Sequence, residues 1–173
     1  MQAMSEYGPT TEETNATPKG GRATFYGTAY HKISGRNQVA IPKHLKRAID
    51  EAQEGQLLLM RMPSENFLRL FTKKQFDSKL DEIKGRADLT ADKKAAVIDA
   101  LARMAEPVEP DSQGRFVLPG KWTDALNLRD EVAFCGAFTY IKIWPAELQR
   151  EQERKDAEKL ADVSEQVTSI LNM

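Results

Sequence analysis

One short pattern occurs twice in the chain. Residues 34–42 read SGRNQVAIP, and residues 111–119 read DSQGRFVLP, 77 positions later. Each copy runs from polar turn residues into a short apolar strand that Pro42 or Pro119 ends, because proline cannot donate to a strand ladder. Half of this chain is too small to bury a core alone, so the repetition predicts two similar halves that pack on each other as a pseudo-dimer.

The residues around the two copies also correspond, and they predict an α+β fold with helices between and after the repeats. We expect a short helix after each proline and then a pair of strands. The expected helices span Lys43 to Glu51 and Gly120 to Leu126. The expected strand pairs are Gln56 to Met62 with Asn66 to Phe71, and Glu131 to Cys135 with Phe138 to Trp144.

The rest of the chain is expected to be a leader and three helices. Met1 to Arg22 is polar with little to bury, which predicts disorder. Helices are expected over Lys73 to Ile83, over Ala91 to Met104 after an N-cap at Thr90, and over Ala146 to Asn172. The last carries an apolar stripe, made of Leu160, Val163, Val167 and Ile170, that indicates packing within the chain or a subunit contact. The predicted division is a leader (1–22), a first repeat with linker helices (23–106), a second repeat (107–145) and a charged C-terminal helix (146–173).

Charge is strongly segregated along the chain, although the net charge is only −1. Residues 14–49 contain seven bases and no acid, whereas residues 1–13 contain three acids and no base. Ordinary solvated surface mixes both signs, so the natural partner of the acid-free stretch is a polyanion. Chance clustering in a basic tail is the alternative, but Lys32, Arg36 and the group from Lys43 to Arg47 fall inside the predicted fold.

The chain offers little for catalysis, metal binding or membrane insertion. It has two histidines, His31 and His44, and one cysteine, Cys135, which lies in an apolar strand and is expected to be buried. No glycine-rich phosphate loop is present, and no apolar run reaches the length of a membrane span. We therefore expect no enzyme activity, no cofactor, no metal, no small-molecule substrate and no membrane partner.

The two turns differ in their side chains. Asp111 can accept backbone N–H groups, Gly114 can take a positive φ, and Arg115 lies near enough to pair with the carboxylate. In the first copy Ser34, Asn37 and Gln38 stand at these positions, and asparagine is among the residues that best tolerate left-handed geometry. The acid and its base are thus replaced together.

Arg36 and Gln113 stand at equivalent positions of the two turns. Each copy therefore keeps one arginine, Arg36 in the first and Arg115 in the second. Only the second arginine has a carboxylate close to it in the sequence. We expect the guanidinium group of Arg36 to remain available to a partner.

The segment FYGTAYHKIS, residues 25–34, and the two turn copies resemble the MraZ family of bacterial transcriptional regulators. That family carries two tandem AbrB-like units, each marked by an Asp-x-x-x-Arg motif, which Asp111 to Arg115 matches and the first copy does not. The resemblance covers about residues 23–150. It implies a swapped-hairpin β-barrel, a ring-like homo-oligomer, and binding to repeated operator sequences ahead of cell-division and cell-wall genes.

The function expected from charge and resemblance is regulation of transcription through double-stranded DNA, in the cytoplasm and at the nucleoid. Phosphate contacts are assigned to Lys32, Lys43, Lys46 and Arg47. Base contacts are assigned to Arg36, Asn37 and Gln38, since arginine suits guanine and the amides suit adenine. The second-repeat motif is Asp111, Gln113 and Arg115. His31 and His44 are expected at the surface near this patch.

One other interpretation remains open at this point. A structural or interaction protein, such as an antitoxin-type partner or a ring scaffold that has lost DNA binding, is suggested by the degenerate first motif and by the charged C-terminal helix. RNA is disfavoured as the nucleic acid because the chain lacks aromatic-rich strands for stacking exposed bases.

Overall fold

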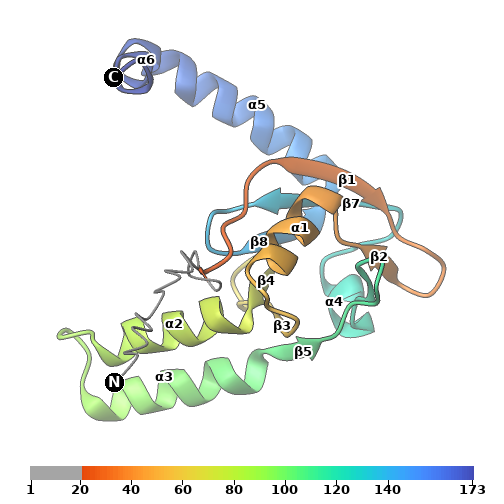
Figure 1. Ribbon diagram of the computed structural model, residues 1–173, viewed down its shortest axis with the longest axis vertical. Helices are drawn as coiled ribbons and strands as arrows, with labels where there is room; N and C mark the ends of the chain where they lie inside the picture. Colours follow the sequence, from red (N-terminus) through yellow and green to blue (C-terminus); the bar gives the residue numbers. More distant parts are fainter. Residues whose placement is uncertain (1–20) are drawn as a thin grey trace, which may run out of the picture.

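The computed structural model describes residues 21–173, and nearly all of the predicted leader therefore lies outside the described residues. The fold is mixed α+β, with antiparallel strands and six helices in the described part (Figure 1). In chain order the elements are β1 (Thr28–Lys32), β2 (Gln38–Ala40), α1 (Lys43–Glu51), β3 (Leu57–Met60), β4 (Leu68–Thr72), α2 (Lys73–Lys84), α3 (Ala91–Met104), β5 (Glu106–Val108), β6 (Arg115–Val117), α4 (Gly120–Ala125), β7 (Glu131–Gly136), β8 (Ile141–Pro145), α5 (Ala146–Asp162) and α6 (Ser164–Leu171).

The strands form one six-stranded antiparallel sheet and one two-stranded ribbon. The order in the sheet is β1-β7-β8-β4-β3-β5, and β2 pairs with β6 in the ribbon. The expectation of a closed β-barrel is wrong, because within residues 21–173 the sheet stays open with β1 and β5 at its two ends. The strands that follow β1 and β5 in the chain, β2 and β6, pair with each other and so do not extend the sheet toward closure.

The sequence of elements β-β-α-β-β-α occurs twice, from β1 to α2 and from β5 to α5. Exchanging β1 with β5, β3 with β7 and β4 with β8 leaves the strand order of the sheet unchanged. The central pairings keep this equivalence, because Val39 lies opposite Phe116 in the ribbon and Arg69 lies opposite Lys142 in the sheet. Each half therefore gives its first strand to the sheet edge formed by the other half.

The largest apolar cluster joins one face of the sheet to the ribbon and to helices α1 and α4. The alternation of a β-strand places Leu57 and Leu59 on this face and Met60 on the other. On the other face, α2 and α3 cover a cluster around Phe71 and Phe76. Helix α5 covers a third cluster, around Trp144.

A chain of side-chain hydrogen bonds fixes the start of α5 to the sheet. The Oε1 atom of buried Gln149 accepts from Trp144 Nε1 at 2.9 Å and from Cys135 Sγ at 3.0 Å, and Gln149 Nε2 donates to Glu153 at 3.3 Å. Tyr30 Oη on β1 donates to the same carboxylate at 2.9 Å. The predicted burial of Cys135 is confirmed, and that burial raises the pKa of its thiol.

Two helices have the predicted bounds, two others (α2 and α4) differ by one residue at the C-terminal end, and the last predicted helix is divided. Helices α1 and α3 begin and end where expected, and Thr90 Oγ1 accepts from Lys93 N at 3.3 Å as the predicted N-cap. The single helix expected after Pro145 is broken at Val163 into α5 and α6. Packing within the chain is wrong for its apolar stripe, because Leu160, Val163 and Ile170 are exposed and Val167 is only half-buried in the described chain. Over residues 21–173, none of the helices is both long and apolar enough to cross a membrane.

Candidate nucleic-acid interface

The two turns have the same backbone structure despite their different residues. Asn37 N donates to Ser34 O at 3.0 Å, and Gly114 N donates to Asp111 O at 2.9 Å. Asn37 has φ of 55° and Gly114 has φ of 77°. The predictions of left-handed backbone at Gly114 and of its replacement by Asn37 are confirmed.

Each turn is held by a strand of the other half. Ile41 N, at the end of β2, donates to Gly114 O at 2.9 Å, and Leu118 N, at the end of β6, donates to Asn37 O at 2.8 Å. Because β2 and β6 are antiparallel, the two turns lie at opposite ends of the ribbon. The ribbon therefore presents one turn at each end.

The second turn neutralises its own arginine. Asp111 Oδ1 accepts from the backbone N of Gln113 and of Arg115, both at 2.9 Å, and Oδ2 accepts from Arg115 Nε at 2.7 Å. The backbone N–H of Arg115 is the largest cause, followed by its guanidinium group, of a lowered pKa of the Asp111 carboxyl. The predicted pairing of Asp111 with Arg115 is confirmed.

The first turn leaves its arginine free within the described chain. Arg36 is exposed, and no carboxylate in residues 21–173 comes within 4.0 Å of it. The same holds for Lys32 at the end of β1 and for Lys43 and Arg47 on α1, all of which are exposed. Ten ion pairs occur elsewhere in the described part, so these four cations differ from many of the other bases.

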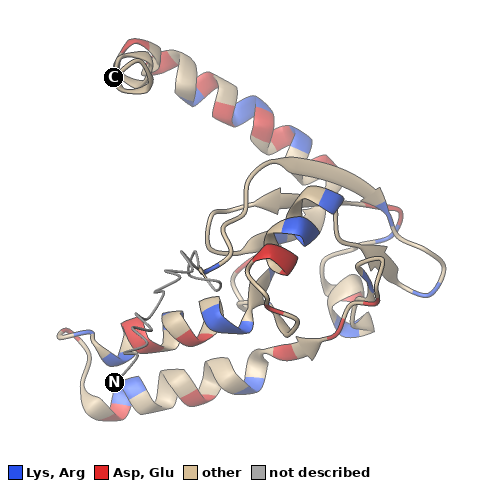
Figure 2. Ribbon diagram, viewed as in Figure 1, with Lys and Arg blue, Asp and Glu red and all other residues tan. Residues whose placement is uncertain are grey.

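Helix α1 carries bases on its solvent face because Leu45 and Ile49 occupy the buried face. Lys43 and Arg47 lie one turn apart and are both exposed, and Figure 2 shows blue segments along α1. Lys46 differs from them, because its Nζ atom pairs with Asp50 at 2.7 Å. The structure thus places Lys46 on the predicted helix but gives it a carboxylate partner.

Each of the two histidines connects two backbone segments of this region through a hydrogen bond. His31 is half-buried, with its ring edge-on to Phe134 at 5.6 Å, so the expectation of a surface position is wrong for it. Its Nδ1 atom donates to Ala40 O at 2.6 Å, which ties β1 to β2. His44 is exposed as expected and donates from Nε2 to Tyr26 O at 3.1 Å, which ties α1 to the segment before β1.

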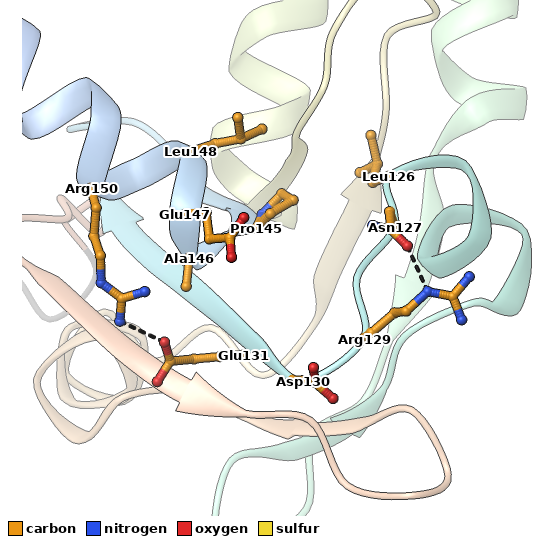
Figure 3. Close-up of a pocket in the computed structure, with 10 residues that line it drawn as sticks. All are labelled: Leu126, Asn127, Arg129, Asp130, Glu131, Pro145, Ala146, Glu147, Leu148 and Arg150. Atoms are coloured by element: carbon orange, nitrogen blue, oxygen red, sulfur yellow. Dashed lines mark hydrogen bonds and ion pairs between the residues drawn. The ribbon is translucent and has the colours of Figure 1, made fainter.

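The sequence reasoning missed a cavity of about 550 Å3 at the start of α5 (Figure 3). Two arginines line it, and both are occupied: Arg150 pairs with Glu131 at 2.7 Å, and Arg129 Nε donates to Asn127 Oδ1 at 2.6 Å. Two further acids, Asp130 and Glu147, also line it. Because acids and bases are mixed in its lining, this cavity has no net positive charge that would attract a polyanion. In residues 21–173, no group of three or more His, Cys, Asp or Glu could hold a metal ion.

Comparison with known proteins gives one consistent family. The model of a family described as "MraZ protein, putative antitoxin-like" matches residues 101–169. The chain is 24% identical over 148 residues to a protein of Bacteroides thetaiotaomicron, covering 86% of this chain and 94% of the relative. It is 28% identical over 145 residues to a protein of Gluconacetobacter diazotrophicus, covering 80% and 91%. Both relatives are named transcriptional regulator MraZ.

Proposed function

On the premise that this chain is an MraZ-family regulator, which the family match and the named relatives support, we propose that it regulates transcription by binding double-stranded DNA. It acts as a ring-like homo-oligomer on repeated operator sequences upstream of cell-division and cell-wall genes. Its place of action is the cytoplasm, at the nucleoid. It needs no cofactor and performs no catalysis.

The proposed fold unit is an AbrB-like swapped-hairpin half-module, used twice as an intrachain pseudo-dimer. The exchange of first strands between the halves supports this assignment, since β1 pairs with β7 and β5 pairs with β3. The proposed division remains a first repeat with linker helices over 23–106, a second repeat over 107–145 and a C-terminal helical region from 146.

The proposed interface has two layers. Lys32, Lys43 and Arg47 contact phosphates and position the protein, with a smaller contribution from Lys46 because Asp50 competes for its charge. The first turn reaches base edges through Arg36, Asn37 and Gln38. The second-repeat motif holds its turn in shape, since Asp111 already binds Arg115.

The observation that carries this proposal is the contrast between two turns of the same backbone structure. One turn pairs its arginine with a carboxylate, and the other presents an exposed Arg36 without an ion pair in the described residues. Lys32, Lys43 and Arg47 are likewise exposed and unpaired there. A polyanion can use such charges without first breaking an internal pair. An antitoxin-type interaction protein is the second candidate, and the "antitoxin-like" description of the family supports it.

The test is a salt titration of binding to the DNA upstream of the chain's own gene, with a scrambled fragment of equal length as control. The three phosphate-contacting cations without an ion pair, Lys32, Lys43 and Arg47, predict that log K falls with log salt at a slope of about −2.7 per bound protomer, and Lys46 should make the slope somewhat steeper. Lys43→Gln and Arg47→Gln should each reduce the slope by about 0.9. Lys46→Gln should reduce it less.

Arg154→Gln, on the exposed part of α5, is the matched control and should leave the slope unchanged. Binding that is indifferent to salt would exclude the phosphate contacts. Equal affinity for the upstream and scrambled fragments would exclude a sequence-specific regulator and favour the interaction protein.

A further inference from the structure

The C-terminal arm, defined as residues 151–173, extends away from the body of the molecule (Figure 1). All of its residues are exposed except Gln152 and Val167, which are half-buried. Ile170 and Leu171 on α6 are 69% and 78% exposed. Together with Val167 they recur at steps of three and one, which places all three on one side of α6.

The apolar side of this helix has no partner in the described part of the chain. Helix α6 follows α5 directly after Val163, so the exposure of Ile170 and Leu171, and not the length of the helix, indicates a partner. Its apolar side contributes nothing to the core of its own chain, because none of its residues is buried. The segment 160–173 contains two acids, Asp162 and Glu165, and no base, so its partner surface should be apolar and should belong to elements of net positive charge.

A groove of about 410 Å3 between α2, α3 and the sheet has these properties. Its lining includes Met60, Met62, Phe71, Leu80 and Leu101. Methionines adapt to the shape of a bound side chain, and amphipathic helices commonly bind in grooves of this kind.

The elements around this groove carry net positive charge. At the groove itself the charges are balanced, because Arg69 pairs with Glu65 and Lys79 pairs with Glu82 at 3.0 Å. The surrounding stretch 61–104 has ten bases and seven acids, whereas the stretch 146–173 that carries the arm has four bases and seven acids. The two surfaces are therefore complementary in charge as well as in polarity.

Helices α2 and α3, which line the groove, lie at the opposite end of the molecule from α6 (Figure 1), so α6 does not occupy the groove of its own chain. Pairing of two arms as a coiled coil is also disfavoured. The break at Val163 divides the stripe between α5 and α6, so it does not form one straight seam.

We propose that α6 of one copy docks its Val167, Ile170 and Leu171 side into the α2–α3 groove of a second copy. The inference rests on the self-assembly included in the proposed function and assigns the two surfaces that make it. Because the two surfaces differ, the contact is head-to-tail, and successive contacts of this type form a ring when the rotation closes.

Site-directed disulfide formation between full-length chains tests this docking. Chains with Ile170→Cys are mixed with longer, tagged chains carrying Met62→Cys, or in a second mixture Leu101→Cys, and then oxidised mildly. The native Cys135 is buried, and the unsubstituted chain treated in the same way is the background. We expect mixed disulfide dimers with both groove cysteines.

Ser169→Cys is the matched control, because it lies on the opposite side of α6 and should give several-fold less mixed product. Light scattering of the same samples measures self-assembly independently. An oligomer that gives no mixed disulfide, or in which Ile170→Cys chains link only to each other, overturns the docking alone. A monomer at all concentrations overturns the proposed self-assembly as well.

Discussion

At the scale of single residues, the left-handed positions of the two turns have the same backbone conformation but do not accept the same side chains. Gly114 has φ of 77°, and a Cβ atom added there would lie 3.0 Å from Lys46 Cδ. Asn37 already adopts the same region with a side chain. The backbone therefore demands glycine in the second turn and only favours a permissive residue in the first.

Gly114→Ala is expected to lower the free energy of unfolding by about 1–2 kcal/mol, because alanine is strained at positive φ and meets the Lys46 side chain. Asn37→Gly should change it by less than about 0.5 kcal/mol, since glycine takes this conformation readily. Urea denaturation of both variants measures the difference. Equal losses would contradict the distinction.

The arginines of the two turns are expected to matter for different properties, Arg36 for DNA binding and Arg115 for stability. Arg36→Ala should abolish specific DNA binding and leave the melting temperature unchanged, because Arg36 makes no ion pair within residues 21–173. Arg115→Ala should lower the melting temperature by about 2 °C and leave DNA affinity largely intact, because it removes a partly exposed pair that steadies the turn. Loss of binding by Arg115→Ala alone would show that the second turn reads the DNA.

Much of this residue-scale detail could be predicted from sequence because it is local. The Asp111–Arg115 pair and the left-handed residues depend on neighbours within four positions. Lys46 and Asp50 are also four apart on a helix, so their pairing was visible in the sequence and was missed. The half-burial of His31 was not visible, because it depends on Phe134, a residue 103 positions away.

At the scale of elements, α5 and β1 are joined through one carboxylate. Tyr30 on β1 donates to Glu153 on α5, and burial, followed by this hydrogen bond, raises the pKa of Tyr30 to about 12. The neutral phenol is thus favoured in the folded state. The raised pKa adds to the free energy of unfolding fully at pH values below the unfolded pKa of about 10, and this stabilisation is lost as the pH rises toward 12.

Tyr30→Phe is therefore expected to flatten the alkaline loss of stability. Between pH 10 and 12, the melting temperature of the unsubstituted chain should fall more steeply than that of the variant. Thermal unfolding followed by circular dichroism gives both curves, and Tyr26→Phe, at an exposed tyrosine, is the control. Parallel curves for all three proteins would contradict the assigned role of Tyr30.

Helices were easier to predict than the pairing of elements. The bounds of α3 follow from a local N-cap and a helical apolar period, and both are present in the sequence. The break at Val163 has no proline or glycine to announce it, since the surrounding residues are Leu-Ala-Asp-Val-Ser-Glu. The sequence pattern therefore predicted one long helix there.

At the scale of the whole molecule, the two halves are interlocked. The outer strands β1 and β5 pair only with strands of the other half, and so do the ribbon strands β2 and β6. The duplication in the sequence predicted two halves in contact. It did not predict an open sheet, because strand order depends on pairings between distant residues that no local pattern records.

Residues 21–105 expressed alone are expected to form no stable monomer, because β1, β2 and one edge of β4 lose their partners. The fragment should be unfolded by circular dichroism or should form a dimer in which each copy replaces the missing half of the other. Light scattering separates these two results. A folded monomer of the fragment would contradict the interlocked description.

The pairing of β1 with β7 also sets an order of events during synthesis. Tyr30 lies opposite Ala133, so about 100 residues must be added after β1 before its partner exists. At roughly 5–20 residues per second, this takes about 5–20 s on the ribosome. During that interval the first third of the protein leaves the exit tunnel with its strand edges unsatisfied, and a nascent chain still being translated from the same messenger is the nearest molecule that can satisfy them.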